Sequence, residues 1–528
     1  MIEDGGEMAE NLLWKADLGN GKYRNPILFT DYSDPDVIRV EDTFYMTASS
    51  FNCVPGLPIL VSKDLVNWEI KNYAVKELPF DTYNQPAYGK GIWAPSIRYH
   101  NNMFWIFVGM PDEGIFMTST KDPLGEWSSL TCVWSGKGFI DPCPFWDDDG
   151  KAYIIHGYAK SRIGFNSKLG IFPMSMDGTI CLGEDIIIFD GTITQPTIEG
   201  PKVYKREGYY YIFAPAGGVE DGWQTVLRST HILGPYEEKI VMHQGSTNIN
   251  GPHQGGLVDT PSHEEWFIHF QDKGVYGRIV HLQPVTWENH WPIIGVNPNE
   301  EGVGEPVLKY RKPSGCPDVM PTEPESSDYF SNGRLGLSWQ WIGNVKEGFY
   351  STSERPGHLR LFPINPTKKP NEILWNCANI LTQKIPVPEF IMEVKMDVFG
   401  LEEGQKTGVI ALGGKYAYLG IKKIKEELYL QYVMSKVIDG VLQEEVQWEK
   451  HLNVKDNEKI VWLQIQFYDT GECKFSISLD GEEDEVVTEY FSPEKAMWVG
   501  AKVGIFAIDE EVPGAKGYVD IEYVEFKK

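Results

Sequence analysis

The sequence predicts an all-β protein that consists of a five-bladed β-propeller followed by a β-sandwich. Short apolar or aromatic runs bounded by Gly, Pro, Asn and Asp dominate the chain, a pattern typical of strands and turns. One motif recurs five times within residues 25–300, at intervals of about 50 to 60 residues that are typical of propellers and other repeat architectures. Strands continue after residue 328 without this motif.

The length of 528 residues exceeds that of one ordinary domain, so at least two domains are expected. We expect an N-terminal extension over residues 1–24 and the propeller over residues 25–300. A connection rich in Pro and acidic residues follows over residues 301–327, and it is interpreted as a surface linker. The sandwich is expected over residues 328–528.

Each copy of the motif begins with a polar or small residue, continues as a short apolar strand, turns, and returns as an aromatic strand. The five copies begin at Asp34, Ala94, Asp141, Glu199 and His253. Five repeats of about four strands each would form the blades of a closed propeller, which has no exposed sheet edge. The first strands of the blades line the central channel, so these opening residues are expected to meet at one place.

The C-terminal part shows the alternation of a sandwich. Residues 389–394 and 460–467 alternate polar and apolar side chains in two-residue steps, and residues 478–481 give a turn signal. A last strand is expected within residues 517–524. About two hundred residues of this pattern predict two packed antiparallel sheets.

Charge and composition narrow the class of partner. The formal net charge of −27 argues against nucleic acid and anionic membranes, because like charges repel. It fits a protein that acts on a neutral substrate. The aromatic content of 13% fits a β-rich core, and some of these rings are candidates to stack on sugar faces.

The cysteines and the N-terminus predict the compartment. Seven cysteines are dispersed without a C-x-x-C pair, which fits a reducing compartment better than a disulfide framework or a zinc site. The first seven residues are acidic and lack the apolar segment of a signal peptide. We therefore expect a cytoplasmic protein, or a periplasmic or secreted one if a signal peptide has been removed.

Three copies of the motif open on a carboxylate, at Asp34, Asp141 and Glu199. Hydrolysis of a glycosidic bond needs one carboxylic acid to protonate the leaving oxygen and a second carboxylate to activate water or to attack. A single Asp-Pro pair at a strand start is often a simple turn. Three carboxylates at openings that we expect to be equivalent, with His253 at the fifth, favour a catalytic site. Mutual repulsion and partial burial are expected to separate their pKa values.

Several segments carry a resemblance to a known family. They are residues 25–28, 33–39, 60–68, 91–97, 140–142, 198–201, 277–278, 284–287 and 291–292. Together they resemble glycoside hydrolase family 43. Residues 328–361 are similar to the start of the concanavalin-like sandwich, a jelly roll, of its β-xylosidase-type members. The resemblance covers nearly the whole chain and implies an inverting hydrolase with a five-bladed propeller.

The resemblance also implies roles for individual residues. Asp34 is expected to be the general base that activates water, and Glu199 the general acid that protonates the leaving oxygen. Asp141 is expected to raise the pKa of Glu199 and to orient it. Inversion needs room for a water molecule between base and sugar, so the two working carboxyls are expected about 6.5–9.5 Å apart.

Four more residues are expected to bind substrate. Arg278 matches the family arginine that reaches the sugar hydroxyls and Asp34. The alternative interpretation of Arg278 is that it forms a surface salt bridge. Phe51 and Trp93 match positions that wall the first subsite, and packing is their alternative. His253 lies beneath the active site in the family.

The cofactor prediction rests on His253. It is sometimes beside a calcium ion or a water cluster in the family, and a buried, hydrogen-bonded histidine is the alternative. A lone His is a weak calcium site because that ion prefers several oxygen ligands. We expect no required cofactor and leave a calcium ion near His253 open. Residues 147–150 lack the Glu that closes a calcium loop, and a hairpin turn explains them better.

The resemblance implies an exo-acting enzyme that releases terminal α-L-arabinofuranose, β-D-xylose or both from hemicellulose-derived oligosaccharides. Residues 52–54 replace a bulkier aromatic stretch of the xylosidase members and favour arabinofuranose, with a strict β-xylosidase as the alternative. A non-catalytic carbohydrate-binding propeller is the alternative of another class. A fructan-cleaving hydrolase is set aside, since Glu199 and Asp141 lack its Glu-Cys and Arg-Asp-Pro contexts.

Overall fold

The computed structural model describes residues 12–369, 371–453, 459–511 and 516–528. Residues 1–11, where the predicted extension begins and the signal-peptide prediction rests, lie outside this part. The prediction of an all-β protein is confirmed, because the regular structure consists of strands apart from short helical turns. These turns are η1 (Asp81–Asn84), α2 (Lys160–Ile163), α3 (Gly218–Asp221), η2 (Gly274–Tyr276) and η3 (Leu374–Asn376). Within the described residues, no helix has the length and apolar character needed to cross a membrane.

The first lobe contains five four-stranded antiparallel sheets, and the strands of each sheet pair in chain order. The first sheet contains β2 (Asp36–Val40), β3 (Thr43–Thr47), β4 (Gly56–Ser62) and β5 (Trp68–Val75). The second contains β6 (Trp93–His100), β7 (Met103–Met110), β8 (Gly114–Thr120) and β9 (Thr131–Ser135). The third contains β10 (Phe139–Trp146), β11 (Ala152–Tyr158), β12 (Lys168–Met174) and β13 (Ile186–Asp190).

The last two sheets of this lobe repeat the arrangement. The fourth contains β14 (Lys202–Arg206), β15 (Tyr209–Ala216), β16 (Trp223–Ser229) and β17 (Glu237–Met242). The fifth contains β18 (His253–Asp259), β19 (Glu265–Asp272), β20 (Arg278–Glu288) and β21 (Trp291–Ile294). The first strands of neighbouring sheets lie together: β2 contacts β6 and β18, β10 contacts β6 and β14, and β15 contacts β18. The starts of these strands therefore gather in one region.

One backbone feature marks the start of every first strand. A residue with φ between 33° and 58° stands at the same point of each motif, followed by Pro or Gly; these residues are Asp34, Ala94, Asp141, Gly200 and Gln254. Aligned on this feature, Glu199 and His253 stand one position earlier than Asp34 and Asp141. The expectation that the three carboxylates open equivalent positions is therefore wrong by one residue. Side-chain type guided the sequence alignment, whereas the left-handed backbone sets the true register.

The N-terminal segment and the predicted linker pair with each other. Strand β1 (Lys22–Arg24) forms a two-stranded antiparallel sheet with β22 (Lys309–Arg311). Next to this sheet, the Nζ of Lys312 lies 2.6 Å from Asp17 Oδ2 and 2.7 Å from Asp64 Oδ2. The predicted linker thus contributes a strand and two ion pairs to the first lobe instead of only passing over its surface.

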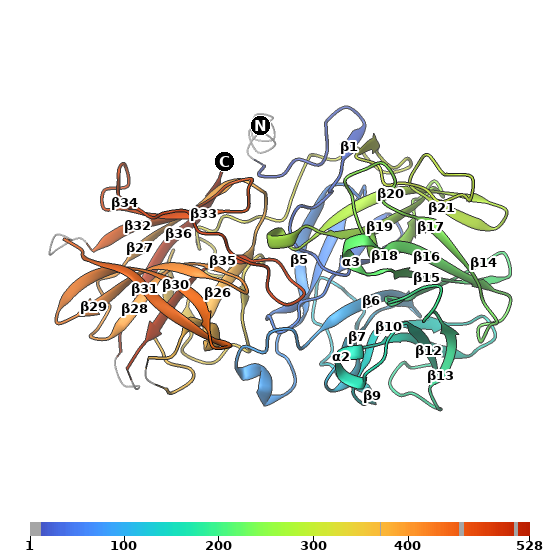
Figure 1. Cartoon of the computed structure of the whole chain (residues 1–528), viewed down its shortest axis with the longest axis horizontal. Coiled ribbons are helices and arrows are strands. Elements are labelled where there is room, and N and C mark those ends of the chain that lie inside the picture. The colour runs from blue at the N-terminus through green and yellow to red at the C-terminus, as the bar shows by residue number, and fades with distance from the viewer. Residues whose placement is uncertain (1–11, 370, 454–458, 512–515) are drawn as a thin grey trace.

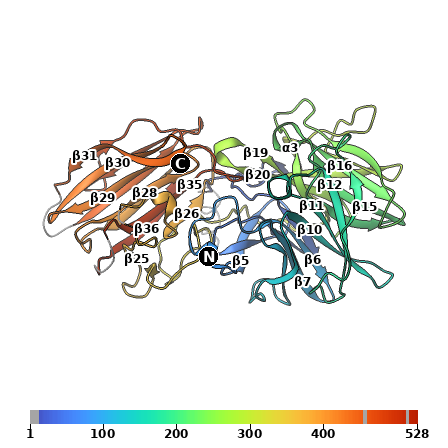
Figure 2. The same ribbon diagram turned by 60° about the horizontal axis from the view of Figure 1, so that its bottom comes forward.

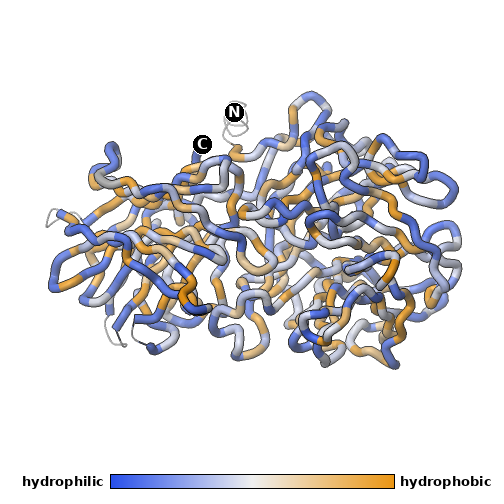
Figure 3. Tube along the Cα trace, in the orientation of Figure 1, coloured by the Kyte–Doolittle hydropathy of each residue, from blue (hydrophilic) through white to orange (hydrophobic). Residues whose placement is uncertain are grey.

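The second lobe is a sandwich of two seven-stranded sheets, as predicted. One sheet has the order β23 (Gln340–Trp341), β26 (Ile380–Lys384), β35 (Lys502–Asp509), β28 (Gln405–Leu412), β29 (Ala417–Ile424), β30 (Glu427–Ile438), β31 (Val441–His451). The other has the order β24 (Tyr350–Ser351), β25 (Leu359–Leu361), β36 (Val519–Lys527), β27 (Phe390–Asp397), β32 (Ile460–Phe467), β33 (Cys473–Ser478), β34 (Asp484–Val487). Alternate residues of β32 are buried, and the change of hydropathy along the strands is visible in Figure 3.

The two lobes lie side by side (Figures 1 and 2) and share backbone hydrogen bonds. Val54 and Trp341 exchange N–H to O contacts of 3.0 and 2.7 Å. The buried amide of Asn344 accepts from the Leu78 backbone N–H and donates to the Leu78 carbonyl, both at 2.9 Å. One apolar cluster joins the first two sheets and the start of β20 to the sandwich, so the sandwich is packed against the side of the first lobe where the first, second and fifth sheets lie.

Replacing Asn344 by Ala is expected to destabilise the protein by about 2–4 kcal/mol, because two buried backbone groups of Leu78 lose their partner. The measurement is urea unfolding followed by tryptophan fluorescence. Asn332→Ala, at an exposed position of the sandwich, serves as the control and should change the midpoint little. An Asn344→Ala midpoint equal to that of the control would contradict the importance of this contact.

Candidate active site

Asp34 lies just before β2 and is 4% exposed. The hydroxyls of Ser33 and Ser49 donate to its Oδ2 at 2.7 and 2.6 Å. Arg278 donates from Nη1 to its Oδ1 at 2.8 Å. Both carboxyl oxygens therefore accept hydrogen bonds from fixed donors, one of them charged, and the carboxyl plane is held in one orientation.

Arg278 begins β20, and its side chain is only 10% exposed. Its guanidinium lies 4.6 Å from the ring centre of Phe270. Its backbone N–H donates to Asp31 Oδ1 at 3.0 Å. The alternative of a surface salt bridge is thus wrong, because the contact with Asp34 is buried and the arginine is held at both its backbone and its side chain.

Asp141 lies inside β10, where the pairing with β11 is interrupted between Ile140 and Cys143. It is 2% exposed. Its Oδ2 accepts from the Gly200 backbone N–H at 2.8 Å and from Gln254 Nε2 at 3.3 Å. Burial, followed by the negative charges of Glu199 and Asp34, raises the pKa of Asp141 well above its usual range. Asp141 therefore lies close enough to Glu199 and Asp34 for electrostatic interaction with both carboxyls.

Glu199 has the most accessible side chain of the three, at 30% exposed. Its Oε1 lies 2.8 Å from His253 Nε2, and the His253 side chain is 1% exposed. His253 is thus a buried, hydrogen-bonded histidine that contacts Glu199. The described residues include no group of three or more His, Cys, Asp or Glu arranged to hold a metal ion. A calcium ion near His253 stays open, as in the sequence-based expectation. Residues 147–150 form the predicted hairpin turn between β10 and β11.

The two predicted aromatic residues lie together. The ring centres of Phe51 and Trp93 are 6.2 Å apart. Arg162 lies 5.0 Å over the Trp93 ring, and Trp498 meets it edge-on at 5.8 Å. Trp498 is 44% exposed and belongs to the loop that precedes β35 of the sandwich. The second lobe therefore brings an aromatic side chain to the predicted substrate site.

Sequence reasoning missed several residues of this site. Ser33 and Gln254 are next to the opening residues of the motif, so an alignment of the motif copies by backbone register would have identified them. Nothing in the sequence pointed to Ser49. Trp498 lies far along the chain in a sandwich loop. The amide of Gly500, in the same loop, donates to Asp31 Oδ2 at 2.9 Å, which joins the loop to the residue that holds Arg278.

The segment that departs from the xylosidase members is anchored to the sandwich. Asn52 donates from Nδ2 to the Ile342 carbonyl at 2.8 Å. The buried Sγ of Cys53 lies 2.7 Å from Lys502 Nζ. These two side chains therefore contact the second lobe.

Comparisons with known proteins identify the family of the chain. The profile of Glycosyl hydrolases family 43 matches residues 23–292, and that of the Beta xylosidase C-terminal Concanavalin A-like domain matches residues 327–527. The chain belongs to glycoside hydrolase family 43. It is a glycoside hydrolase, and the alternative of a non-catalytic binding propeller is not supported.

Two relatives and one solved structure are similar over at least 66% of the chain. A putative beta-xylosidase of Xylanibacter ruminicola is 37% identical, over 93% of this chain and 87% of the relative. A non-reducing end alpha-L-arabinofuranosidase of Bacteroides ovatus is 31% identical, over 66% of this chain and 67% of the relative. The crystal structure of a family 43 protein of Bacillus licheniformis has a TM-score of 0.81 at 26% identity, over 96% of this chain and 99% of that one.

Replacing Asp141 by Asn is expected to stabilise the protein above about pH 4. The raised pKa means that the folded state holds this proton more tightly than the unfolded state, so wild-type stability is lost as pH rises from about 4 towards the folded pKa. The Asn variant avoids this loss, which amounts to about 1.4 kcal/mol for each pH unit that separates the folded and unfolded pKa values. Thermal unfolding of both proteins from pH 4 to 8 measures the difference, which should vanish at the acid end.

Asp147 provides a control of opposite sign. Burial opposes its charge, but hydrogen bonds from Lys205 and Tyr210 outweigh burial and lower its pKa. Asp147→Asn should therefore destabilise the protein at neutral pH. An Asp141→Asn protein that is less stable than wild type at pH 7 would contradict the raised pKa.

Proposed function

We propose that this family 43 enzyme is an exo-acting, inverting hydrolase that releases terminal α-L-arabinofuranose, β-D-xylose or both from hemicellulose-derived oligosaccharides. Relatives named for each activity support both sugars. The observation that carries the proposal is the set of three neighbouring carboxyls in different surroundings. Asp34 is fixed by Arg278, Asp141 is buried with a raised pKa, and Glu199 is accessible beside His253.

In the proposed mechanism, Asp34 is the general base. It accepts the proton of a water molecule, which attacks the anomeric carbon while the bond to the leaving oxygen breaks. Glu199 donates its proton to that oxygen. Asp141 is proposed to orient Glu199, and burial, together with the negative charge of Glu199, raises the pKa of Asp141. Arg278, already bound to Asp34, is placed to orient sugar hydroxyls. None of these steps requires a cofactor.

We also propose that the five sheets of the first lobe are the blades of a five-bladed propeller. The contacts that run from β2 through β6, β10 and the fourth sheet to β18, and from β18 back to β2, support a closed ring. The chain-order pairing within each sheet is typical of propeller blades. The three carboxyls would then stand at one mouth of the central channel.

The sandwich supports exo action. Its loop presents Trp498 at the edge of Trp93 and is joined to Asp31 through Gly500. A loop at this position closes one side of the proposed site. A pocket closed on one side suits the end of an oligosaccharide better than an internal segment of a polymer.

Turnover of an aryl arabinofuranoside and an aryl xyloside tests the function directly. We expect hydrolysis of at least one, and proton NMR of the fresh product should show the inverted anomer first. A retained anomer would overturn the role of Asp34. Absence of turnover with both substrates, together with measurable oligosaccharide binding, would overturn the proposed function.

Replacing Glu199 by Ala tests the proton donor. Hydrolysis of glycosides with poor leaving groups should fall by about 10²–10⁴-fold, the usual contribution of general acid catalysis. Activated aryl glycosides should lose much less, since their leaving group needs no proton. Glu220→Ala, at an exposed site on α3, is the control. Equal losses on both classes of substrate would contradict the acid role of Glu199.

A further inference from the structure

A cysteine of the first lobe and a lysine of the second lobe meet in the interior between the lobes. Cys53 lies between β3 and β4, and Lys502 is the first residue of β35. They are 5% and 7% exposed, and Cys53 Sγ lies 2.7 Å from Lys502 Nζ. This distance is ordinary for an oxygen acceptor, so it is short for the larger sulfur atom. The two side chains are therefore in closer contact than a hydrogen bond to a thiol requires.

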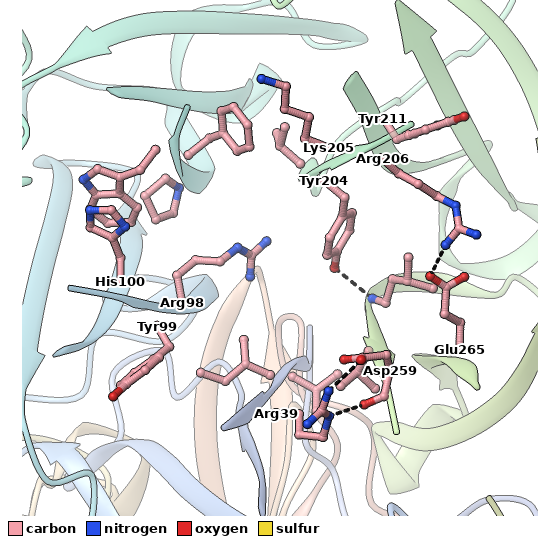
Figure 4. Close-up of a pocket in the computed structure, with 18 of the residues that line it drawn as sticks. Arg39, Arg98, Tyr99, His100, Tyr204, Lys205, Arg206, Tyr211, Asp259 and Glu265 are labelled. Carbon is pink, nitrogen blue, oxygen red and sulfur yellow. Dashed lines mark hydrogen bonds and ion pairs between the residues drawn. The ribbon is translucent and has the colours of Figure 1, made fainter. Parts of the chain in front are cut away.

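The cations of the hollow in Figure 4 provide a comparison for Lys502. This hollow, of about 540 Å³, lies near the far ends of the first strands. Each of its four cations has a carboxylate partner: Arg39 has Asp259, Arg98 has Asp36, Lys205 has Asp147 and Arg206 has Glu265. Among the described residues, no carboxylate is paired with Lys502, and the thiol of Cys53 is its hydrogen-bond partner. Because a thiol is a weak acceptor, a buried ammonium at Lys502 lacks full compensation.

A second buried lysine belongs to the same cluster. Burial lowers the pKa of Lys384, on β26, to about 8; the charge of Asp31 opposes this change and the charge of Lys502 adds to it. The two lysines therefore lie close enough for their like charges to repel. An amine nitrogen that is bonded to oxygen is a weak base and carries no charge at neutral pH. Oxidation of Lys502 to such a group removes the repulsion.

A small cavity adjoins the pair. Its volume is about 20 Å³, and both Cys53 and Lys502 line it. This is room for one small molecule. Apolar side chains, among them Ile342, Leu412 and Val499, line other parts of the cavity. A cavity of this size and character suits dioxygen, which is small and uncharged.

We propose that Cys53 and Lys502 form a covalent crosslink in which one oxygen atom joins Sγ to Nζ, with dioxygen as the oxidant. The S–H bond, one N–H bond of the neutral amine and the O–O bond break, while an S–O bond and an O–N bond form. Sulfur and nitrogen lose two electrons each. One oxygen atom of dioxygen enters the bridge, and the other leaves as water with the two hydrogens.

The distance between the two atoms suits this bridge. A bent oxygen with one single bond to sulfur and one to nitrogen spans nearly the separation that Cys53 Sγ and Lys502 Nζ already have. A direct S–N bond is much shorter and would require the lobes to move together. The structure therefore holds the two side chains ready for an oxygen-bridged product.

The crosslink ties the sandwich to the wall of the proposed substrate site. Cys53 is two residues from Phe51, and Lys502 is four residues from Trp498. Gly500, between Trp498 and Lys502, donates to Asp31. The crosslink thus fixes the sandwich loop against the first lobe beside the two aromatic side chains.

Peptide mapping by high-resolution mass spectrometry tests the crosslink on the full-length protein. Protein held in air-saturated buffer and then digested should yield one joined pair of peptides that contains Cys53 and Lys502. The pair should differ from the sum of the separate peptides by one added oxygen and two lost hydrogens. Protein prepared and kept without oxygen should yield the separate peptides. Separate peptides alone after aeration, or a joined pair without the added oxygen, would overturn the proposal.

Three variants locate the crosslink. Cys53→Ser and Lys502→Arg each remove one partner, and the second keeps the positive charge, so neither should give the joined pair. Cys132→Ser removes an exposed thiol and, as the control, should keep it. A joined pair that persists in Cys53→Ser or Lys502→Arg would place the crosslink at other residues and overturn the proposal.

Thermal unfolding gives a second readout. The crosslink joins residues 449 positions apart and, like a disulfide that closes a long loop, should raise the midpoint of the aerated protein by about 3–6 °C over the oxygen-free protein. A difference of the same size in Cys53→Ser would contradict this cause. The wild-type comparison needs no substitution, so it decides alone where a variant does not fold. Neither readout depends on turnover, so a failure of the proposed glycosidase activity leaves this test unaffected.

Discussion

The site depends on a left-handed backbone residue at the start of each first strand. Four of the five are not glycine, and such a conformation costs about 1–3 kcal/mol each, so surrounding contacts must over-determine it. Asp34 has these contacts from two serine hydroxyls and Arg278, and Asp141 has them from the Gly200 amide and Gln254. The hydrogen bonds that hold the carboxyls in place therefore also hold the backbone that presents them.

Gathering three acids in a buried region is costly because like charges repel and burial removes the water that would screen them. The structure offsets this cost with a basic group for each acid. Arg278 contacts Asp34, His253 contacts Glu199, and the charge of the buried Lys202 acts on Asp141. At Asp141, burial and the negative charges of Glu199 and Asp34 outweigh the effect of Lys202, so the pKa of Asp141 is raised. The arrangement thus gives three similar side chains three different surroundings, as acid–base chemistry requires.

The sandwich is connected to the site through a short chain of hydrogen bonds. The Gly500 amide and the Arg278 amide both donate to Asp31, and Arg278 in turn donates to Asp34. Burial raises the pKa of Asp31, and both of its carboxyl oxygens accept from backbone amides. The second lobe therefore helps to set the position of the arginine, in addition to providing Trp498.

The sequence by itself determined the strands, the five-fold motif and the sandwich, and it predicted the seven residues that we propose for the site. Strand periodicity and turn chemistry are local properties that one chain displays directly, and the motif added the family resemblance. Tertiary structure alone decided the one-residue offset of Glu199 and His253, since that register follows backbone φ and not side-chain type. It also decided the approach of Trp498 and the raised pKa of Asp141. Each of these depends on segments distant in sequence meeting in a low-dielectric interior, and no local pattern records such a meeting.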